Sequence, residues 1–224
     1  MIAIICAMDK ERQSFIDALT NKNEQLIMGY SFMTGQINGH DTVLVKCGIG
    51  KVQAGVVTML LIEHFHPEVV INSGIAGGFD KSLKELDIVC ATKVSAYDVD
   101  FTAEGLPLGS LNGEDRFVEN DITLKETNGF SLKYGLILSA DTFATDRKHL
   151  EEIIDKYYQD EEVVAIDMES ATIARICSEQ NTKWCVIRAI SDVIGGTKQV
   201  FNYEKFASQA ASLSFQLIYQ NYFQ

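Results

Sequence analysis

Residues 69–78 read VVINSGIAGG and indicate which class of fold this chain adopts. A largely apolar run, 69–73, is ended by a cluster of glycines. The runs 134–138, 163–167 and 184–190 have the same apolar character. Strands that are apolar on both faces are typical of a parallel sheet covered by helices on both sides. We therefore expect such a sheet to form the centre of the molecule.

Short strand-like runs alternate with helical patterns along the whole chain, which is the signature of an α/β fold. Expected strands cover 2–7, 25–30, 32–37, 42–47, 69–73, 87–97, 134–138, 163–167 and 184–190. Expected helices cover 9–20, 51–65, 119–127, 147–158, 169–180 and 203–222. Gly29 and Asn38-Gly39 are turn signals, so residues 25–47 are expected to form an antiparallel meander and the sheet to be mixed. The stretch 102–118 is the longest irregular segment and a candidate functional loop.

Length and composition limit the possible functions. The 224 residues suit one domain, 1–224, and 46% hydrophobic residues can form a sizeable core. There are 19 basic and 31 acidic side chains, which give a formal charge of −12. Such a chain repels phosphate backbones and anionic lipid, so neither nucleic acid nor a membrane is expected as a partner.

The expected location is the cytoplasm. The apolar start, 2–8, meets charged residues at 9–12 and resembles a buried strand rather than a signal peptide. Every other hydrophobic run is interrupted before it could span a bilayer. The five cysteines are an odd count without a C-x-x-C pair, which favours reduced core thiols and no metal site.

Candidate functional residues follow the ends of four expected strands. Met8 and Glu11 follow 2–7, the glycine cluster follows 69–73, Met168 and Glu169 follow 163–167, and Ser191-Asp192 follow 184–190. Ligands of open α/β sheets bind beyond the carboxyl ends of strands. If these strands are parallel, the three carboxylates converge on one small-ligand pocket, where burial and mutual repulsion raise their pKa values.

Each candidate also has a purely structural interpretation. Glu11 and Glu169 suit the first turn of a helix, where acids favour the helix dipole. Asp192 suits a cap or turn, and the glycines suit a tight connection from strand to helix. Arg188 in so apolar a strand needs an acidic partner, and Phe143 suits either the core or a stack on a planar base.

Six motifs taken together are more informative than any one of them. In chain order they are Ala7-Met8-Asp9-Lys10-Glu11, Gly48-Ile49-Gly50-Lys51, Asn72-Ser73-Gly74-Ile75-Ala76-Gly77-Gly78, Ser139-Ala140-Asp141-Thr142-Phe143, Ile166-Asp167-Met168-Glu169 and Arg188-Ala189-Ile190-Ser191-Asp192. This series resembles that of the 5′-methylthioadenosine/S-adenosylhomocysteine nucleosidases of the nucleoside phosphorylase superfamily. The resemblance covers the whole chain. It implies a homodimeric three-layer α/β/α sandwich around a mixed, twisted central sheet, which hydrolyses adenine nucleosides without a cofactor.

The resemblance also implies a role for each catalytic residue. Asp192 would be the general acid that protonates the leaving adenine, and Glu11 would activate the attacking water, with Arg188 holding Glu11 or the water. Glu169 would accept hydrogen bonds from the ribose hydroxyls and stabilise the developing ribosyl cation. A carboxylate at residue 11 would repel phosphate, so hydrolysis is expected rather than phosphorolysis.

The expected substrate-binding residues are Met8, Ile49, Ile75, Ala76, Gly77, Phe101, Phe143, Met168 and Ser191. Phe143 would stack on adenine, while Met8, Ile49, Phe101 and Met168 would form an apolar slot for a thioether. Ile75 stands where the family often has serine, and Glu104 and Leu106 stand where it often has aromatics. These departures leave two alternatives open: a hydrolase of a nucleoside with another 5′ group or base, such as a futalosine-type substrate, and a nucleoside-binding sensor without turnover.

Overall fold

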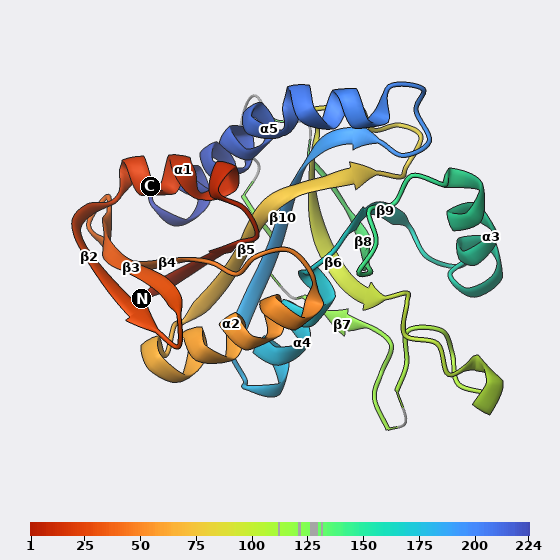
Figure 1. Ribbon diagram of the computed structural model, residues 1–224, viewed down its shortest axis with the longest axis horizontal. Helices are drawn as coiled ribbons and strands as arrows, with labels where there is room; N and C mark the ends of the chain where they lie inside the picture. Colours follow the sequence, from red (N-terminus) through yellow and green to blue (C-terminus); the bar gives the residue numbers. More distant parts are fainter. Residues whose placement is uncertain (112, 121, 126–129, 131) are drawn as a thin grey trace.

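In the computed structural model the sheet lies between two pairs of helices (Figure 1). The structure describes residues 1–224 except 112, 121, 126–129 and 131. Helices α1 and α5 pack on one face of the sheet, and α2 and α4 pack on the other. The helices are α1 (Asp9–Ala18), α2 (Lys51–Phe65), α3 (Arg147–Tyr157), α4 (Ser170–Glu179) and α5 (Gln199–Tyr222). The expectation of a mixed α/β fold is confirmed.

The strands follow the expected order along the chain. They are β1 (Ile2–Cys6), β2 (Thr20–Ile27), β3 (Tyr30–Ile37), β4 (His40–Lys46), β5 (Val69–Gly78), β6 (Ile88–Ala96), β7 (Val118–Glu119), β8 (Leu132–Ser139), β9 (Val163–Asp167) and β10 (Lys183–Val193). Strands β2, β3 and β4 form the expected antiparallel meander, and β4 joins β1 in parallel. The sheet is therefore mixed, as predicted.

Strand β5 lies at the centre of the pairing. It runs parallel to both β1 and β10, and its last two residues pair antiparallel with β9. Because β10 also pairs with β6, and β8 pairs with β6 and β9, these strands close into a ring. The carboxyl ends of β1, β5, β9 and β10 therefore lie close together.

The glycine cluster continues β5 rather than connecting it to a helix, so that structural interpretation is wrong. Side chains in β10 and directly after it explain why glycine suits these positions. A Cβ on Gly77 would lie 2.9 Å from Cγ1 of Ile194, and one on Gly78 would lie 3.0 Å from Cγ2 of Ile190. A side chain at 77 or 78 would force these isoleucine side chains to shift, which is why glycine suits both positions.

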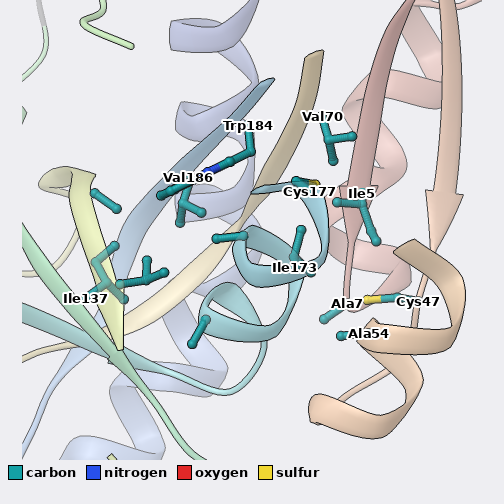
Figure 2. Packing of buried hydrophobic residues seen from close by; sticks show 14 of the residues in the cluster. Ile5, Ala7, Cys47, Ala54, Val70, Ile137, Ile173, Cys177, Trp184 and Val186 are labelled. Carbon is teal, nitrogen blue, oxygen red and sulfur yellow. The ribbon is translucent and has the colours of Figure 1, made fainter. Parts of the chain in front are cut away.

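Buried aliphatic side chains fill the space between the sheet and the helices. Figure 2 shows Ala54 of α2 and Ile173 of α4 on the side of the sheet that carries Ile5, Val70 and Val186. A second cluster packs under α1 and α5, and a third under α3. All five cysteines are buried and free. This packing fixes the strand ends that carry the candidate site.

The expected helix at 119–127 is wrong for the residues that the structure describes. Val118–Glu119 is strand β7, and residues 122–125 are not helical. The main chain here bonds to other elements: Asn120 N donates to Thr92 O at 2.8 Å, and Lys125 N donates to Asn221 Oδ1 at 2.7 Å. Residues 121, 126 and 127 of that prediction lie outside the described residues, as does residue 112 of the candidate loop 102–118. The described part of that loop contains one 3₁₀ turn, Thr102–Glu104.

Near the candidate site, the ends of three further elements differ from those expected from the sequence. Strand β10 extends to Val193 past a bulge between Ile190 and Asp192, because its pairing with β5 continues. Helix α4 begins one residue after Glu169, which is its N-cap. Helix α5 begins at Gln199 rather than at 203. Among the described residues, no helix combines the length and apolarity needed to cross a membrane.

Candidate active site

A pocket of about 320 Å³ opens where β1, β5, β9 and β10 end, a size suited to a small ligand. Its walls are formed by Ala7, Met8, Glu11, Ile49, Ile75, Ala76, Gly77, Thr142, Phe143, Ala144, Ile166, Asp167, Met168, Glu169, Ser191, Asp192 and Tyr203. Most of the residues expected from the sequence are in this set. Two are not: Arg188 lies behind the wall, and Phe101 lies elsewhere.

Glu11 is a buried carboxylate held by main-chain donors from two elements. Its Oε2 accepts hydrogen bonds from Ala7 N at 2.9 Å and Met8 N at 2.8 Å, and its Oε1 accepts one from Ile75 N at 3.1 Å. Glu11 therefore does cap the first turn of α1, but it also reaches across to β5. Burial raises its pKa above the usual value, and the charge of Arg188 and these three N–H groups act against that rise.

Gly74 of β5 makes room for the Glu11 carboxylate. A Cβ at residue 74 would lie 2.8 Å from Glu11 Oε1 and 3.3 Å from Arg188 Nη1. A side chain there would displace the acid or the guanidinium, so glycine is the residue that this close approach requires.

Glu169 is the second buried acid of the pocket. Its Oε1 accepts a hydrogen bond from Gly50 N at 2.9 Å, which ties the start of α4 to the start of α2. Burial, helped by the charges of Asp167 and Glu11 and opposed by the charge of Arg188, raises its pKa to about 7. Glu11 and Glu169 therefore lie close enough to repel one another.

Arg188 is fully engaged in a network behind the pocket wall. Its Nε donates to Asp167 Oδ2 at 2.9 Å, and its Nη2 donates to Asn72 Oδ1 at 2.5 Å and Ser170 Oγ at 2.9 Å. The acidic partner that the sequence requires for Arg188 is thus Asp167. Ser139 Oγ also donates to Asp167, at 2.5 Å. The guanidinium acts on Glu11 and Glu169 through its charge.

Asp192 is the third buried acid, and only 1% of it is exposed. Ser191 Oγ donates to its Oδ1 at 2.6 Å, and the Gln199 side-chain amide donates to its Oδ2 at 2.8 Å. Burial raises the pKa of Asp192, while these two hydrogen bonds act in the opposite direction. Because β10 continues through residue 193, Asp192 is a strand residue and not a cap.

The open rim of the pocket is apolar and aromatic. Ile49 and Phe143 are about half exposed there, so Phe143 is not a core residue. The Phe143 and Tyr203 rings meet edge to face at 5.5 Å, and Lys10 Nζ donates to Tyr203 Oη at 3.1 Å. Phe101 is not among the residues that line the pocket; it lies on the surface, directly before the 3₁₀ turn of the 102–118 loop.

Outside the six motifs, sequence reasoning missed Ala144, which lines the pocket, and two residues of α5, Gln199 and Tyr203. Both lie on the first two turns of α5, where the strand exit at Asp192 leads into the helix. The helix expected from the sequence begins at residue 203 and so does not include Gln199. An amide and an aromatic so soon after an acidic strand end are the signal that would have identified them.

Apart from Asp167, which pairs with Arg188, the geometry presents three buried acids to one pocket, all three with raised pKa values and with a fully bonded arginine behind them. Such a pocket can donate a proton at Asp192, accept one at Glu11 and bind hydroxyl groups at Glu169. Among the described residues, no group of three His, Cys, Asp or Glu side chains is arranged to hold a metal ion.

The strand order and the placement of this pocket define a class of protein, and the chain belongs to it: the Phosphorylase superfamily, whose family description matches residues 1–220. Within that class the chain is similar to 5′-methylthioadenosine/S-adenosylhomocysteine nucleosidases. The protein of that name from Bacillus velezensis is 35% identical over 225 residues, which cover 97% of this chain and 96% of the relative. The resemblance predicted from the motifs is thereby confirmed.

Solved structures agree with this assignment. The nucleosidase of the same name from Colwellia psychrerythraea, in complex with adenine, has a TM-score of 0.89 and 34% identity, and the match covers 97% of this chain and 92% of that one. The futalosine hydrolase of Helicobacter pylori has a TM-score of 0.86 and 26% identity, with 97% and 94% covered. The same fold therefore carries more than one nucleoside specificity.

Proposed function

We propose that this protein hydrolyses the N-glycosidic bond of adenine nucleosides, with 5′-methylthioadenosine and S-adenosylhomocysteine as its substrates. The products are adenine and the 5-thioribose. The observation that carries the proposal is the meeting of Glu11, Glu169 and Asp192 in one pocket. The relatives named for this reaction support it.

The proposed reaction begins at the base. An N-glycoside breaks through an oxocarbenium-like ribosyl cation, so the leaving adenine must be protonated, at N7. Asp192 supplies that proton. An ordinary aspartate is almost completely ionised at pH 7, and the burial that raises the pKa of Asp192 keeps more of it protonated. Phe143 stacks on the adenine ring at the rim.

Glu169 and Glu11 act on the sugar and the water. Glu169 accepts hydrogen bonds from the ribose 2′ and 3′ hydroxyls with the oxygen that Gly50 N leaves free. Its negative charge stabilises the ribosyl cation, an interaction that grows in the transition state. Glu11 deprotonates the water that attacks C1′, and Arg188, held by Asp167, favours the ionised form of Glu11 through its charge.

Adenine release from a panel of nucleosides tests this proposal. We expect release from methylthioadenosine and adenosylhomocysteine without phosphate. Release that requires phosphate would make the protein a phosphorylase, and tight binding without release would make it a sensor. The similarity to a futalosine hydrolase favours a second candidate substrate, a nucleoside with a bulkier 5′ group, which the same panel includes.

We also infer that the protein acts as a homodimer. On α2, Val52, Val56 and Met59 recur at helical spacing and are exposed, which forms an apolar stripe on the outward face. A second copy would cover it. Light scattering at micromolar concentration should give a dimer mass, and Val56→Glu should give a monomer. A monomeric wild-type protein would contradict the inference.

A further inference from the structure

The side-chain amide of Gln199 joins two walls of the pocket. Its Nε2 donates to Asp192 Oδ2 at 2.8 Å and to Ala144 O at 2.7 Å, and its Oε1 accepts a hydrogen bond from Gly195 N at 2.9 Å. The residue is 6% exposed. Both donors and the acceptor of the amide are therefore used within the protein.

These partners fix which way the amide faces. Asp192 as an anion and Ala144 O can only accept hydrogen bonds, while Gly195 N can only donate one. Turning the amide over would place its oxygen against Asp192 and Ala144 O, which are both acceptors. It would also place its NH₂ group against Gly195 N, which is a donor. The NH₂ group therefore always points at Asp192, and Oδ2 of Asp192 is always offered a donor.

The two oxygens of Asp192 consequently have different neighbours. Ser191 Oγ beside Oδ1 is a hydroxyl, which accepts a hydrogen bond as readily as it donates one. The Gln199 NH₂ group beside Oδ2 cannot accept a proton. A proton on Asp192 must therefore lie on Oδ1, or on the side of Oδ2 that faces away from Gln199.

We propose that Gln199 is a positioning residue for protonation of the base: it holds the Asp192 carboxyl group in register with the 142–144 loop and keeps Oδ2 as a hydrogen-bond acceptor. This inference rests on the proposed role of Asp192 as general acid. Ala144 is the neighbour of Phe143 in sequence, so the Gln199 amide sets the distance between Asp192 and the aromatic ring at the rim of the pocket.

The sign of the effect on pH dependence follows from the contact. A donor to the ionised carboxylate stabilises the ionised form, so Gln199 lowers the pKa of Asp192 against the larger effect of burial. Without that donor the pKa rises. Because the acid must be protonated, kcat/KM falls as pH rises through this pKa, and removal of the donor moves that fall to higher pH.

Other ionisable groups around Asp192 stay unchanged when Gln199 is replaced. They are Glu11, Asp167, Glu169 and Tyr203 in the pocket, Arg188 paired with Asp167, Glu85 between β5 and β6, whose charge raises the pKa of Asp192, and Arg147 of α3, which donates to Ile194 O at 3.4 Å. A shift seen on replacing residue 199 is therefore attributable to the lost amide.

The experiment is the pH profile of kcat/KM for adenine release by wild type, Gln199→Met and Gln199→Glu. In the Gln199→Met variant we expect the alkaline fall of kcat/KM to move to higher pH by about one unit, which is a tenfold change in the acid dissociation constant of Asp192. The plateau value of kcat/KM should drop about tenfold. The Gln199→Glu variant keeps the shape of the side chain but adds a negative charge beside Asp192, so its alkaline fall of kcat/KM should move to still higher pH.

Gln13→Met is the matched control, because Gln13 also donates to an aspartate, Asp17, at 2.8 Å, but on the exposed face of α1. It should leave the profile unchanged. Titration of the Asp192 carboxyl carbon by ¹³C NMR measures the same shift without turnover, and so separates this inference from the proposed function. If folded Gln199→Met and Gln199→Glu titrate as wild type does in both measurements, Gln199 has only a structural role and the inference is overturned.

Discussion

Arg188 Nη2 lies 2.8 Å from Asp167 Oδ2, and each of these side chains is only 2% exposed. A charge buried this deeply must be neutralised by a partner, and Asp167 is the partner that leaves the pocket acids Glu11 and Glu169 free for substrate. The pair therefore connects the stability of the sheet to the chemistry of the pocket.

Replacing Asp167 by asparagine should destabilise the protein by about 3–5 kcal/mol, because the change leaves a buried guanidinium without its counter-charge. Urea unfolding measures the loss. Asp9→Asn is the control, since Asp9 pairs with Lys46 at 2.7 Å on the surface and should cost less than about 1 kcal/mol. Equal losses for the two variants would show that burial of the pair has no special energetic importance.

Replacing Glu11 by glutamine should lower kcat for adenine release by about 10²–10⁴-fold, because an amide cannot take the proton of the attacking water. Its carbonyl oxygen still accepts the main-chain bonds that Ala7 and Met8 donate, and only the bond from Ile75 N is lost, so the fold is expected to persist. Calorimetry should show adenine bound as tightly as by wild type. A variant that keeps more than a tenth of wild-type kcat would remove Glu11 from the chemistry.

Glu169 should make the protein less stable as pH rises. Its folded pKa of about 7 exceeds the usual 4.5, so the native state binds its proton more tightly than the unfolded chain does. The stability that this proton contributes is present below pH 4.5 and is lost between about 4.5 and 7. Glu169→Gln should therefore match wild type in unfolding experiments at pH 4.5 and exceed it at pH 8, while losing activity. The same difference from wild type at both pH values would contradict the shift.

Gly74→Ala should lower activity at least tenfold, because the added methyl would lie 2.8 Å from Glu11 Oε1. Gly55→Ala provides the comparison. That Cβ would lie 3.4 Å from Thr172 Cγ2, an ordinary contact, and alanine favours a helix by up to about 1 kcal/mol. Thermal melts and adenine assays on both variants test the pair, and wild-type activity in Gly74→Ala would show that the close approach is unimportant.

Most of the site could be predicted from the sequence, because most of its residues follow strands that local patterns alone identify. The apolar runs ending near Ala7, Ser73, Asp167 and Ile190 are local patterns. Parallel pairing with β5 brings the ends of β1 and β10 together, as expected, whereas β9 reaches the same place by antiparallel pairing with the last residues of β5. The sequence does not indicate which acid pairs with Arg188, since that depends on how β9 and β10 are positioned relative to β5.

The wrong predictions likewise arise from contacts between residues that are far apart in the sequence. The helix expected at 119–127 does not begin at residue 119 because β6, which is far away in sequence, pairs with Val118–Glu119 and offers Thr92 O to Asn120 N. The extension of β10 to Val193 likewise follows from continued pairing with β5. Gln199 became part of the site only through three contacts that no periodicity reveals.

The most direct test of the account is adenine release from 5′-methylthioadenosine in phosphate-free buffer made with ¹⁸O water, by wild type and by Asp192→Asn. We predict that wild type releases one adenine per nucleoside and places one ¹⁸O on the pentose, and that the folded variant is slower by 10²–10⁴-fold. Wild-type protein that cleaves only when phosphate is added, or a variant as fast as wild type, would contradict it.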